Sequence, residues 1–326
     1  MAGNTPFFAS EILSYLTGQE ALATTLTPYL GLFTTMPSGT ASGTEVSGLG
    51  YARIEVNGSS FWNAPVQGSP TSVTNSATFT FPNATVLSPP ANPTLSSTAG
   101  GTLAATTYYV IITYVGASGE TTGSGEVSLA VAADNLLVVD SPAASSGAVG
   151  WNVYVGTASG GETKQNSSYI AIGTNWTEPT TGLISGSAVP TTNTASWGNI
   201  LGVGLWDAST GGDLLYSGWL GNAKYWPFTA TTSGNLISAY GITAGTTGFA
   251  NGVNVIFSEG FGGTAPTGLS LNTLYTVSNL SSDTFTVGAT LTANGSGNVR
   301  MVVPQTMVPN NRLQINAGEM ILQYST

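Results

Sequence analysis

The stretch from Thr78 to Leu95 begins as a strand and ends as a proline-rich connector, and this limits how the chain can fold. Residues Thr78 to Phe81 alternate polar and apolar side chains, which is the period of a half-buried strand. Prolines follow at positions 82, 89, 90 and 93. Each removes a backbone donor and favours an extended neighbour, so strand pairing must stop here. Either a domain ends at this point, or one domain is interrupted and resumes later.

The surface of this chain must be polar without being charged. Only 6 % of the residues are charged, against roughly 25 % in an average soluble domain. The hydrophobic share of 41 % supports a packed core and is too high for a disordered chain. With 43 glycines and many threonines and valines, the composition predicts an all-β protein whose short strands are joined by turns.

The charge distribution excludes one large class of function. The formal net charge is −10, and the five basic residues are scattered along the chain: Arg53, Lys164, Lys224, Arg300 and Arg312. Nucleic-acid binding needs clustered cations that displace counterions. We therefore expect no nucleic-acid partner.

Two missing residue types remove much of catalytic chemistry. The chain has no cysteine and no histidine, which excludes disulfides, cysteine nucleophiles, histidine-dependent triads and the common zinc sites. No apolar run reaches the roughly 18 residues that cross a bilayer, and the N-terminus lacks the features of a signal peptide. We expect no cofactor, no metal and no membrane insertion, with assembly in a reducing cytoplasm.

The N-terminal residues carry the clearest helix signal. Thr5 suits the N-cap, Pro6 the first helical position and Gly18 the position after the C-cap. Apolar side chains fall on one face at helical spacing, namely Phe8, Ile12, Tyr15 and Leu16. This face either packs on a sheet of its own chain or anchors the protein to a neighbouring subunit.

Strand signals after the prolines predict a separate unit. Residues 106–114 alternate in polarity, and further strand patterns follow within residues 136–142 and 150–163. About 105 residues with short strands at intervals of roughly 8–12 residues suit an antiparallel sandwich of immunoglobulin or fibronectin type III size.

Strand signals that belong to the first domain resume after this unit. Ile200–Trp206 and Leu214–Trp219 flank a turn at residues 207–213. We expect Ile200–Trp206 to pair with the strand at Thr78–Phe81 and so complete a sheet that began before the insertion. The first domain is then interrupted and not finished. A second series of short strands and turns fills residues 229–300.

The expected architecture is a discontinuous β-sandwich core with an N-terminal helix and two inserted β modules. Residues 1–86, 196–228 and 301–326 form the core. Residues 87–195 form the inserted sandwich, and residues 229–300 form a small β module. Such insertions are tolerated at exposed loops whose two ends lie close together.

Several blocks of the expected core share a recognisable pattern. They are Tyr29–Thr35, Gly43–Arg53, Thr74–Thr85, Trp197–Leu220 and Ile315–Ile321. Together they resemble a compact family of bacteriophage virion proteins, the tail-fibre or minor tail proteins. Leu49 stands where that family usually has glycine, a departure that affects a turn and not the resemblance. The two insertions resemble the immunoglobulin-like or fibronectin type III-like modules and the small β modules of phage tail proteins. The resemblance implies no catalytic residues.

Paired carboxylates are the residues that would indicate a glycan-degrading enzyme, because glycan hydrolysis needs two carboxyl groups on opposite sides of one cleft. Asp207 and Asp213 bracket one hairpin turn, and Glu120 and Glu126 bracket another. Each is more simply a turn residue, so we expect no enzyme and keep a glycan-degrading one as the weakest alternative. With Ser209, the two aspartates also supply oxygen atoms for a Ca²⁺ loop, but they lack the spacing and terminal Glu of an EF-hand. We expect a plain hairpin turn there, with a calcium site at Asp207–Asp213 as the alternative.

Aromatic residues are the candidates for an interface. Tryptophan is found at seven positions, and exposed Trp or Tyr rings anchor protein partners or stack on sugars. The contexts of Trp62 in SSFWNAP and Trp226 in KYWPF indicate side chains that face a partner. Phe7 and Phe8 join them as candidates through the anchor interpretation of the N-terminal helix.

The sequence therefore predicts a non-enzymatic bacteriophage virion protein, assembled in the cytoplasm of a host bacterium. Its expected place is the tail, as a fibre, tip or adaptor that docks on other virion proteins and contacts the host surface through a glycan or receptor. A capsid decoration protein that stabilises the head lattice is the alternative. We expect a homo-oligomer, and a trimer in particular.

Overall fold

The computed structural model describes residues 3–4, 10, 13–14, 17, 26–37, 42–68, 71–221, 224–242, 247–259, 263–308 and 310–324. Almost all of the regular structure in these residues is β-strand, which confirms the predicted all-β class. The predicted N-terminal helix lies largely outside the described residues. Ser10, Leu13 and Ser14 are helical, and the backbone N–H of Thr17 donates to the carbonyl of Leu13 at 2.9 Å.

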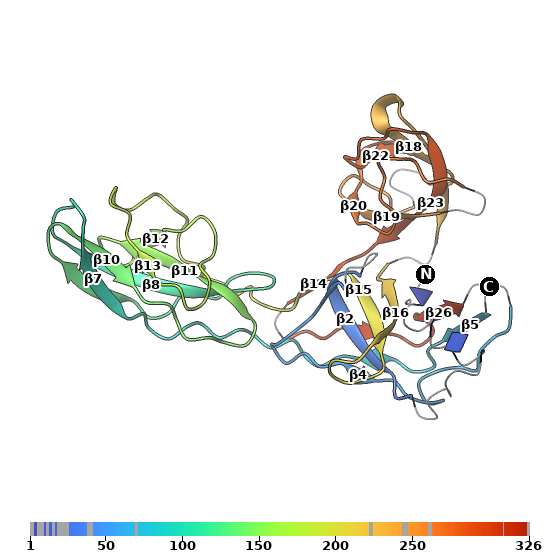
Figure 1. Ribbon diagram of the computed structural model, residues 1–326, viewed down its shortest axis with the longest axis horizontal. Helices are drawn as coiled ribbons and strands as arrows, with labels where there is room; N and C mark the ends of the chain where they lie inside the picture. The colour runs from blue at the N-terminus through green and yellow to red at the C-terminus, as the bar shows by residue number, and fades with distance from the viewer. Residues whose placement is uncertain are drawn as a thin grey trace.

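A six-stranded antiparallel sheet is the main element of the core (Figure 1). Its order is β1-β16-β15-β2-β3, and β4 also pairs with β2. The strands are β1 (Gly3–Asn4), β2 (Tyr29–Thr35), β3 (Thr44–Glu45), β4 (Ile54–Glu55), β15 (Gly202–Trp206) and β16 (Leu214–Trp219). The sheet thus joins strands from both sides of the first insertion.

The predicted partner of the opening strand is wrong. β15 pairs with β2 and β16, in a register that places Gly204 opposite Gly31. The strand from the Thr78–Phe81 stretch, β6 (Phe79–Thr80), pairs instead with β25 (Gln314–Ile315). Every residue of β15 is buried, as a central strand covered on both faces requires, whereas β6 alternates between buried and exposed. Alternation identified the faces of these strands but not their neighbours.

The C-terminal segment closes the core through three two-stranded ribbons. In each ribbon it pairs with a segment that precedes it by at least one insertion. The ribbons are β14 (Gly198–Ile200) with β24 (Gln305–Met307), β6 with β25, and β5 (Thr71–Thr74) with β26 (Ile321–Tyr324). The chain therefore returns twice to the same body after leaving it.

Two sheets within residues 95–177 pack on each other as a sandwich. One has the order β13-β10-β7 and the other β12-β11-β8-β9. The strands are β7 (Leu95–Ala99), β8 (Thr106–Gly116), β9 (Val127–Val131), β10 (Asn135–Val139), β11 (Ala148–Gly156), β12 (Thr163–Lys164) and β13 (Trp176–Thr177). Trp151 from the second sheet and Leu137 from the first are fully buried between them.

Residues 226–302 form a seven-stranded sheet with the order β20-β19-β23-β17-β18-β22-β21. Its strands are β17 (Trp226–Thr231), β18 (Leu236–Ala239), β19 (Asn254–Ser258), β20 (Tyr275–Thr276), β21 (Ser278–Ser281), β22 (Thr284–Thr286) and β23 (Gly295–Val302). A separate hydrophobic cluster fills this unit. The sheet begins at Trp226 and ends at Val302, slightly outside the 229–300 interval expected from the sequence.

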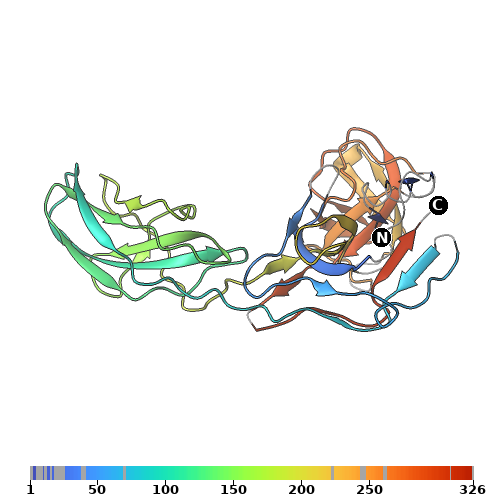
Figure 2. The ribbon, with the colours of Figure 1, turned by 60° about the horizontal axis from the view of Figure 1, so that its bottom comes forward.

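The sandwich projects from one side of the molecule, away from the N and C marks (Figures 1 and 2). Its two connectors run together, since the Asn193 Nδ2 donates to the carbonyl of Leu87 at 2.7 Å. Leu49 of the core takes a positive φ of 50° and lies against Gly147 of the sandwich. Trp197 secures the Leu49 backbone by donating its indole N–H to the Leu49 carbonyl at 2.9 Å. The sandwich therefore has a packed contact with the core as well as two connectors.

Candidate functional site

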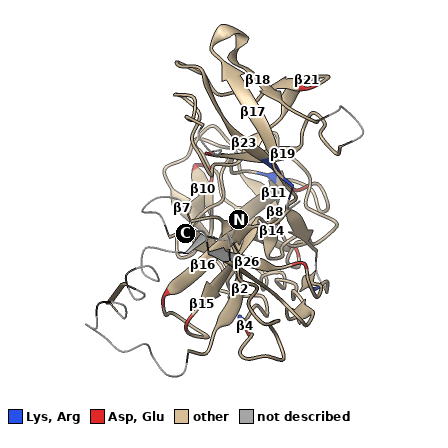
Figure 3. Cartoon of the chain, turned by 90° about the vertical axis from the view of Figure 1, so that its right-hand side faces the viewer, with Lys and Arg blue, Asp and Glu red and all other residues tan. Residues whose placement is uncertain are grey.

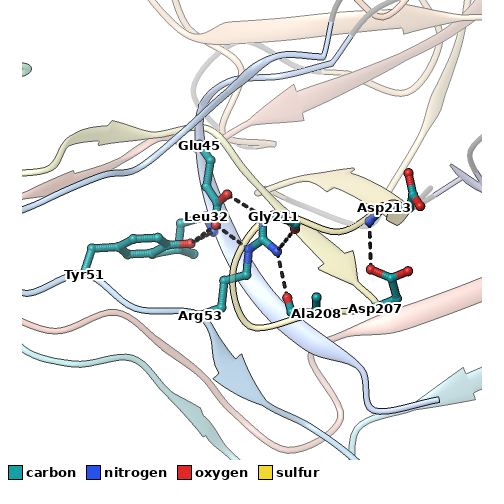
Figure 4. A network of polar contacts seen from close by, with 8 residues as sticks. All are labelled: Leu32, Glu45, Tyr51, Arg53, Asp207, Ala208, Gly211 and Asp213. Carbon is teal, nitrogen blue, oxygen red and sulfur yellow. Dashed lines mark hydrogen bonds and ion pairs between the residues drawn. The ribbon is translucent and has the colours of Figure 1, made fainter. Parts of the chain in front are cut away.

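A partly buried ion pair joins β3 to the segment before β4 (Figure 4). Arg53 Nη2 lies 2.7 Å from Glu45 Oε2, and Arg53 Nε lies 2.8 Å from Glu45 Oε1. The Tyr51 hydroxyl donates to Glu45 Oε1 at 2.7 Å and accepts from the Leu32 N–H at 2.9 Å. Burial raises the pKa of Tyr51, and the neighbouring Glu45 carboxylate adds to that rise. Two parallel bonds from one guanidinium give this pair a defined geometry.

The same arginine holds the turn between β15 and β16. Arg53 Nη1 donates to the carbonyls of Ala208 at 2.8 Å and Gly211 at 2.7 Å. Its guanidinium also lies 4.1 Å from the centroid of the Trp206 ring. These contacts join the blocks around residues 43–53 and 197–220, because each supplies half of one network.

The turn at residues 207–213 is a hairpin turn organised by its own residues. Asp207 Oδ1 accepts the N–H of Asp213 at 2.7 Å. Two carbonyls of the same turn, those of Ala208 and Gly211, accept from Arg53, which places a positive charge against it. In the described part of the chain, no group of three or more acidic side chains could hold a metal ion.

The candidate interface residues have different surroundings. Phe7 and Phe8 lie outside the described residues. Trp62 is partly buried, donates its indole N–H to the Val56 carbonyl at 2.7 Å and packs edge-on against Phe79. The Trp62 ring therefore packs against the core of its own chain.

The prediction for Trp226 needs a correction. Its side chain is only 2 % exposed and packs edge-on against Phe249 with ring centroids 5.1 Å apart. Trp226 is the first residue of β17, on which Phe228 and Ala230 are also buried while Pro227 is exposed. Buried and exposed residues alternate along β17 from Trp226 onward. Trp226 therefore belongs to the core of its own module.

The carboxylates considered for catalysis belong to separate networks. Glu120 Oε1 accepts the Tyr154 hydroxyl at 2.7 Å and also the Thr113 hydroxyl. Glu126 accepts the Ser159 hydroxyl at 2.9 Å and the Gly160 N–H at 3.0 Å. Each is a structural acceptor, Glu120 beside β8 and β11 and Glu126 at the turn after β11.

Glu126 has a second carboxylate as its neighbour. Glu162 is only 5 % exposed, and burial followed by its contact with Glu126 raises the pKa of Glu162. A hydrogen bond from Glu162, followed by one from the Gly160 N–H, lowers the pKa of Glu126. Each of the two carboxyl groups therefore influences the protonation of the other.

An open groove of about 750 Å³ lies on the flank of the sandwich. Its walls include Lys164 of β12, Asn152 of β11, Glu120 from the loop after β8 and Tyr169 from the segment after β12. Tyr169 is 54 % exposed, whereas Asn152 is 1 % exposed. The sequence offered one signal for this groove, because Lys164 is the only basic residue between positions 87 and 195. Figure 3 shows how sparsely charges are spread over the molecule.

A second groove, of about 720 Å³, lies along the C-terminal strands of the core. Val303 and Ile321 line it and are 47 % and 39 % exposed. Arg312 and Glu319 add one charge of each sign. The core thus offers a partly apolar surface with polar margins.

Comparison with protein families gives a match at the N-terminal part of the chain. Residues 4–95 match the family described as "Podophage GP4 fiber I protein gp80". The matched segment contains β2 to β6 and both members of the Glu45–Arg53 ion pair. The similarity supports a phage tail-fibre family and, with it, a structural component of the virion. Comparison with curated proteins and with solved structures gave no match. Among the described residues, no helix is long and apolar enough to span a membrane.

Proposed function

We propose that this chain is a structural protein of a bacteriophage tail, a fibre, tip or adaptor, that works by docking on other virion proteins. The observation that carries the proposal is the match of residues 4–95 to a phage fibre family. That segment supplies the core strands β2, β3 and β4 and one strand of each of two closing ribbons. The similarity thus falls on the body of the molecule and not on an insertion.

The arrangement of the three units supports separate roles for the core and the insertions. The core holds both ends of the chain, and the sandwich extends away from them (Figures 1 and 2). The core also has the partly apolar groove at residues 303–321. In the proposal, the core contacts virion partners and further copies of itself as a homotrimer, and the insertions face outward to the host surface.

The protein acts by binding and not by catalysis in this proposal. The carboxylates that the sequence offered for glycan cleavage are engaged in turns and in separate hydrogen-bond networks. We expect incubation of the purified chain with host surface polysaccharide to leave the polysaccharide's length distribution unchanged. Shortened polysaccharide in the presence of the pure chain would contradict this part of the proposal.

Separation of purified particles into heads and tails tests the proposed location. Quantitative mass spectrometry should recover the chain with the tails, in a few to tens of copies for each particle. Recovery with the heads, in hundreds of copies, would contradict the proposal and would show a capsid decoration protein. Chemical cross-linking of the purified chain tests the trimer separately, since a trimer gives no cross-linked species above three copies.

A further inference from the structure

We propose that the groove on the flank of the sandwich binds an acidic saccharide, a pyranose that carries a carboxylate. The inference rests on the proposed function, because it gives the outward-facing insertion a ligand at the host surface. Three features of the groove carry it: a fixed exposed ring, preorganised polar groups, and a single cation. Each comes from a different segment of the sandwich.

The ring is that of Tyr169. It lies directly against Gly150, where an added Cβ would be 2.3 Å from the Tyr169 Cδ2. The next residue, Ile170, exchanges two backbone hydrogen bonds with Trp151, at 2.8 Å and 2.9 Å. The ring is thus held by a strand of the sandwich while 54 % of the side chain remains exposed. A fixed aromatic face is a suitable platform for the apolar C–H face of a pyranose ring.

The polar groups of the groove are oriented before any ligand binds. Glu120 is held by hydroxyl groups of Tyr154 and Thr113, both on its Oε1. Asn152 is held through its Oδ1, which accepts from Asn166 Nδ2 at 2.7 Å. Groups fixed in this way lose little conformational entropy when they bind sugar hydroxyls.

The cation of the groove is Lys164, and it determines the class of sugar. The unit from 87 to 195 carries acidic residues at positions 120, 126, 134, 140, 162 and 178 but no other basic residue. Lys164 lines the groove and is absent from the ion pair found in the described residues, which joins Arg53 and Glu45. Its backbone is fixed by pairing with Tyr154 and by a bond to the Ser187 carbonyl at 2.9 Å. The groove also holds the Glu120 carboxylate, whose Oε1 already accepts two hydroxyl groups. An anionic group on the ligand is therefore accommodated beside Lys164, the basic side chain of the groove, and sugar hydroxyls beside Glu120.

Binding of defined oligosaccharides to the full chain tests the proposal. The probes are oligomers of glucuronate, galacturonate and mannuronate and an oligosaccharide ending in N-acetylneuraminate, with a glucose oligomer as the neutral match for glucuronate. Saturation-transfer NMR identifies binders and calorimetry measures their affinity. We expect at least one acidic probe to bind, with the glucose oligomer about tenfold weaker or worse than its acidic match.

Exposed-residue variants connect the binding to the groove. Tyr169→Ala and Lys164→Met should each weaken binding about tenfold, whereas Tyr169→Phe and Lys164→Arg should largely retain it. Tyr240→Ala is the matched control, because Tyr240 is 58 % exposed on the other insertion, and it should leave binding unchanged. Melting curves of all variants should coincide with that of the parent chain, since these side chains do not fill a core.

Several outcomes would overturn the inference. Absence of binding to every acidic probe removes the saccharide site. Binding that Tyr169→Ala and Lys164→Met leave unchanged places the site elsewhere, and equal affinity for the glucose oligomer refutes the acidic assignment. The proposed function fails by a different measurement, the recovery of the chain with heads, so a tail-located chain without saccharide binding refutes this inference alone.

Discussion

The two insertions are built from similar short strands and turns, but they stabilise their interiors by different means. The sandwich buries polar side chains with partners: Glu178 is 2 % exposed and accepts the Tyr108 hydroxyl at 2.6 Å and the Leu137 N–H at 3.2 Å. The seven-stranded module instead packs aromatic rings on each other, as with Phe228 and Phe257, whose centroids are 5.1 Å apart. The sandwich interior therefore combines apolar packing with a buried, hydrogen-bonded carboxylate, whereas the module packs aromatic rings on each other.

Both insertions leave a buried indole nitrogen unpaired, and the module also leaves part of an arginine unpaired. In the part of the chain that the structure describes, the indole nitrogens of Trp151 in the sandwich and Trp226 in the module, and Nε and Nη2 of Arg300, are buried without a hydrogen-bond partner. Arg300 is 6 % exposed, and its guanidinium lies 5.5 Å from the centroid of the Tyr225 ring. Burial lowers the pKa of Arg300. Similar strand patterns in the sequence therefore do not determine whether the polar side chains buried in a β unit have hydrogen-bond partners.

The largest effect is expected for a ring of the module's core. Phe257 is fully buried between Phe228 and Tyr275. Phe257→Ala should lower the free energy of unfolding of the module by about 4 kcal/mol, measured by denaturant unfolding. Tyr240→Ala, an exposed aromatic of the same unit, should change it by less than about 0.5 kcal/mol. A loss below about 1 kcal/mol for Phe257→Ala would refute the packing account of this interior.

Two arginines with different partners form the pair for the next effect. The Arg53 side chain is 7 % exposed and ion-paired, whereas Arg300 is 6 % exposed as a whole residue and has no hydrogen bond at Nε or Nη2. Arg53→Met should destabilise the protein by about 3 kcal/mol, because it leaves Glu45 without its partner. Arg300→Met should stabilise it by about 2 kcal/mol, because it removes an uncompensated charge. Thermal unfolding of both variants checks the opposite signs, and a loss of stability for Arg300→Met would show that this charge has a compensating contact.

Removal of one hydroxyl tests the polar interior of the sandwich. Tyr108→Phe leaves Glu178 Oε1 without its donor and should lower the free energy of unfolding by about 2 kcal/mol. Tyr109→Phe, the next residue along β8 and on its other face, is the control and should be nearly neutral. Equal effects of the two substitutions would mean that the Glu178 bond contributes nothing specific.

The same tyrosine makes the sandwich sensitive to high pH. Burial, and then the Glu178 carboxylate, raise the pKa of Tyr108. Its stabilising contribution is therefore complete below the ordinary tyrosine pKa of about 10 and is lost as the pH rises towards the folded-state value. The difference in stability between the parent chain and Tyr108→Phe should shrink above pH of about 10. A constant difference there would contradict the cause assigned to the shift.

The smallest effect concerns the carboxylate pair of the sandwich. Because the pKa of Glu162 is raised in the folded protein, its favourable contribution is present below the ordinary Glu pKa of about 4.3 and is lost as the pH rises. Glu162→Gln should therefore stabilise the protein by about 1 kcal/mol at neutral pH and by less in acid. Melting temperatures measured across the pH range check the trend, and a gain that grows towards acid pH would reverse the assigned sign.

Sequence reasoning identified the kind of element well and its partners poorly. The all-β class and strands such as β16 (Leu214–Trp219) follow from composition, strand patterning and turn residues. Alternation reports which side chains share a face, so it could not show that β6 pairs with a strand more than two hundred residues away, at Gln314–Ile315. Strand neighbours are set by packing of the whole chain.

The candidate sites also depend on contacts between distant segments, which local sequence patterns do not show. The KYWPF context of Trp226 favours a partner-facing side chain, and only the pairing of β17 with β23 and the burial of its ring show that it faces inward. The groove residues come from four separate segments, so no local pattern joins Tyr169 to Glu120. Leu49 was visible as a departure from the family pattern, and the structure supplies a reason, since its side chain lies against Gly147 of the insertion.

Cryo-electron microscopy of intact particles tests the central claim most directly, that this is a tail protein with a docked core and a projecting sandwich. Maps of head and tail would be searched with the described residues as separate core and sandwich units. The account predicts density for the core against the tail body and for the sandwich on its outer side. Density for the chain across the head lattice, or a sandwich enclosed by other virion proteins, would contradict it.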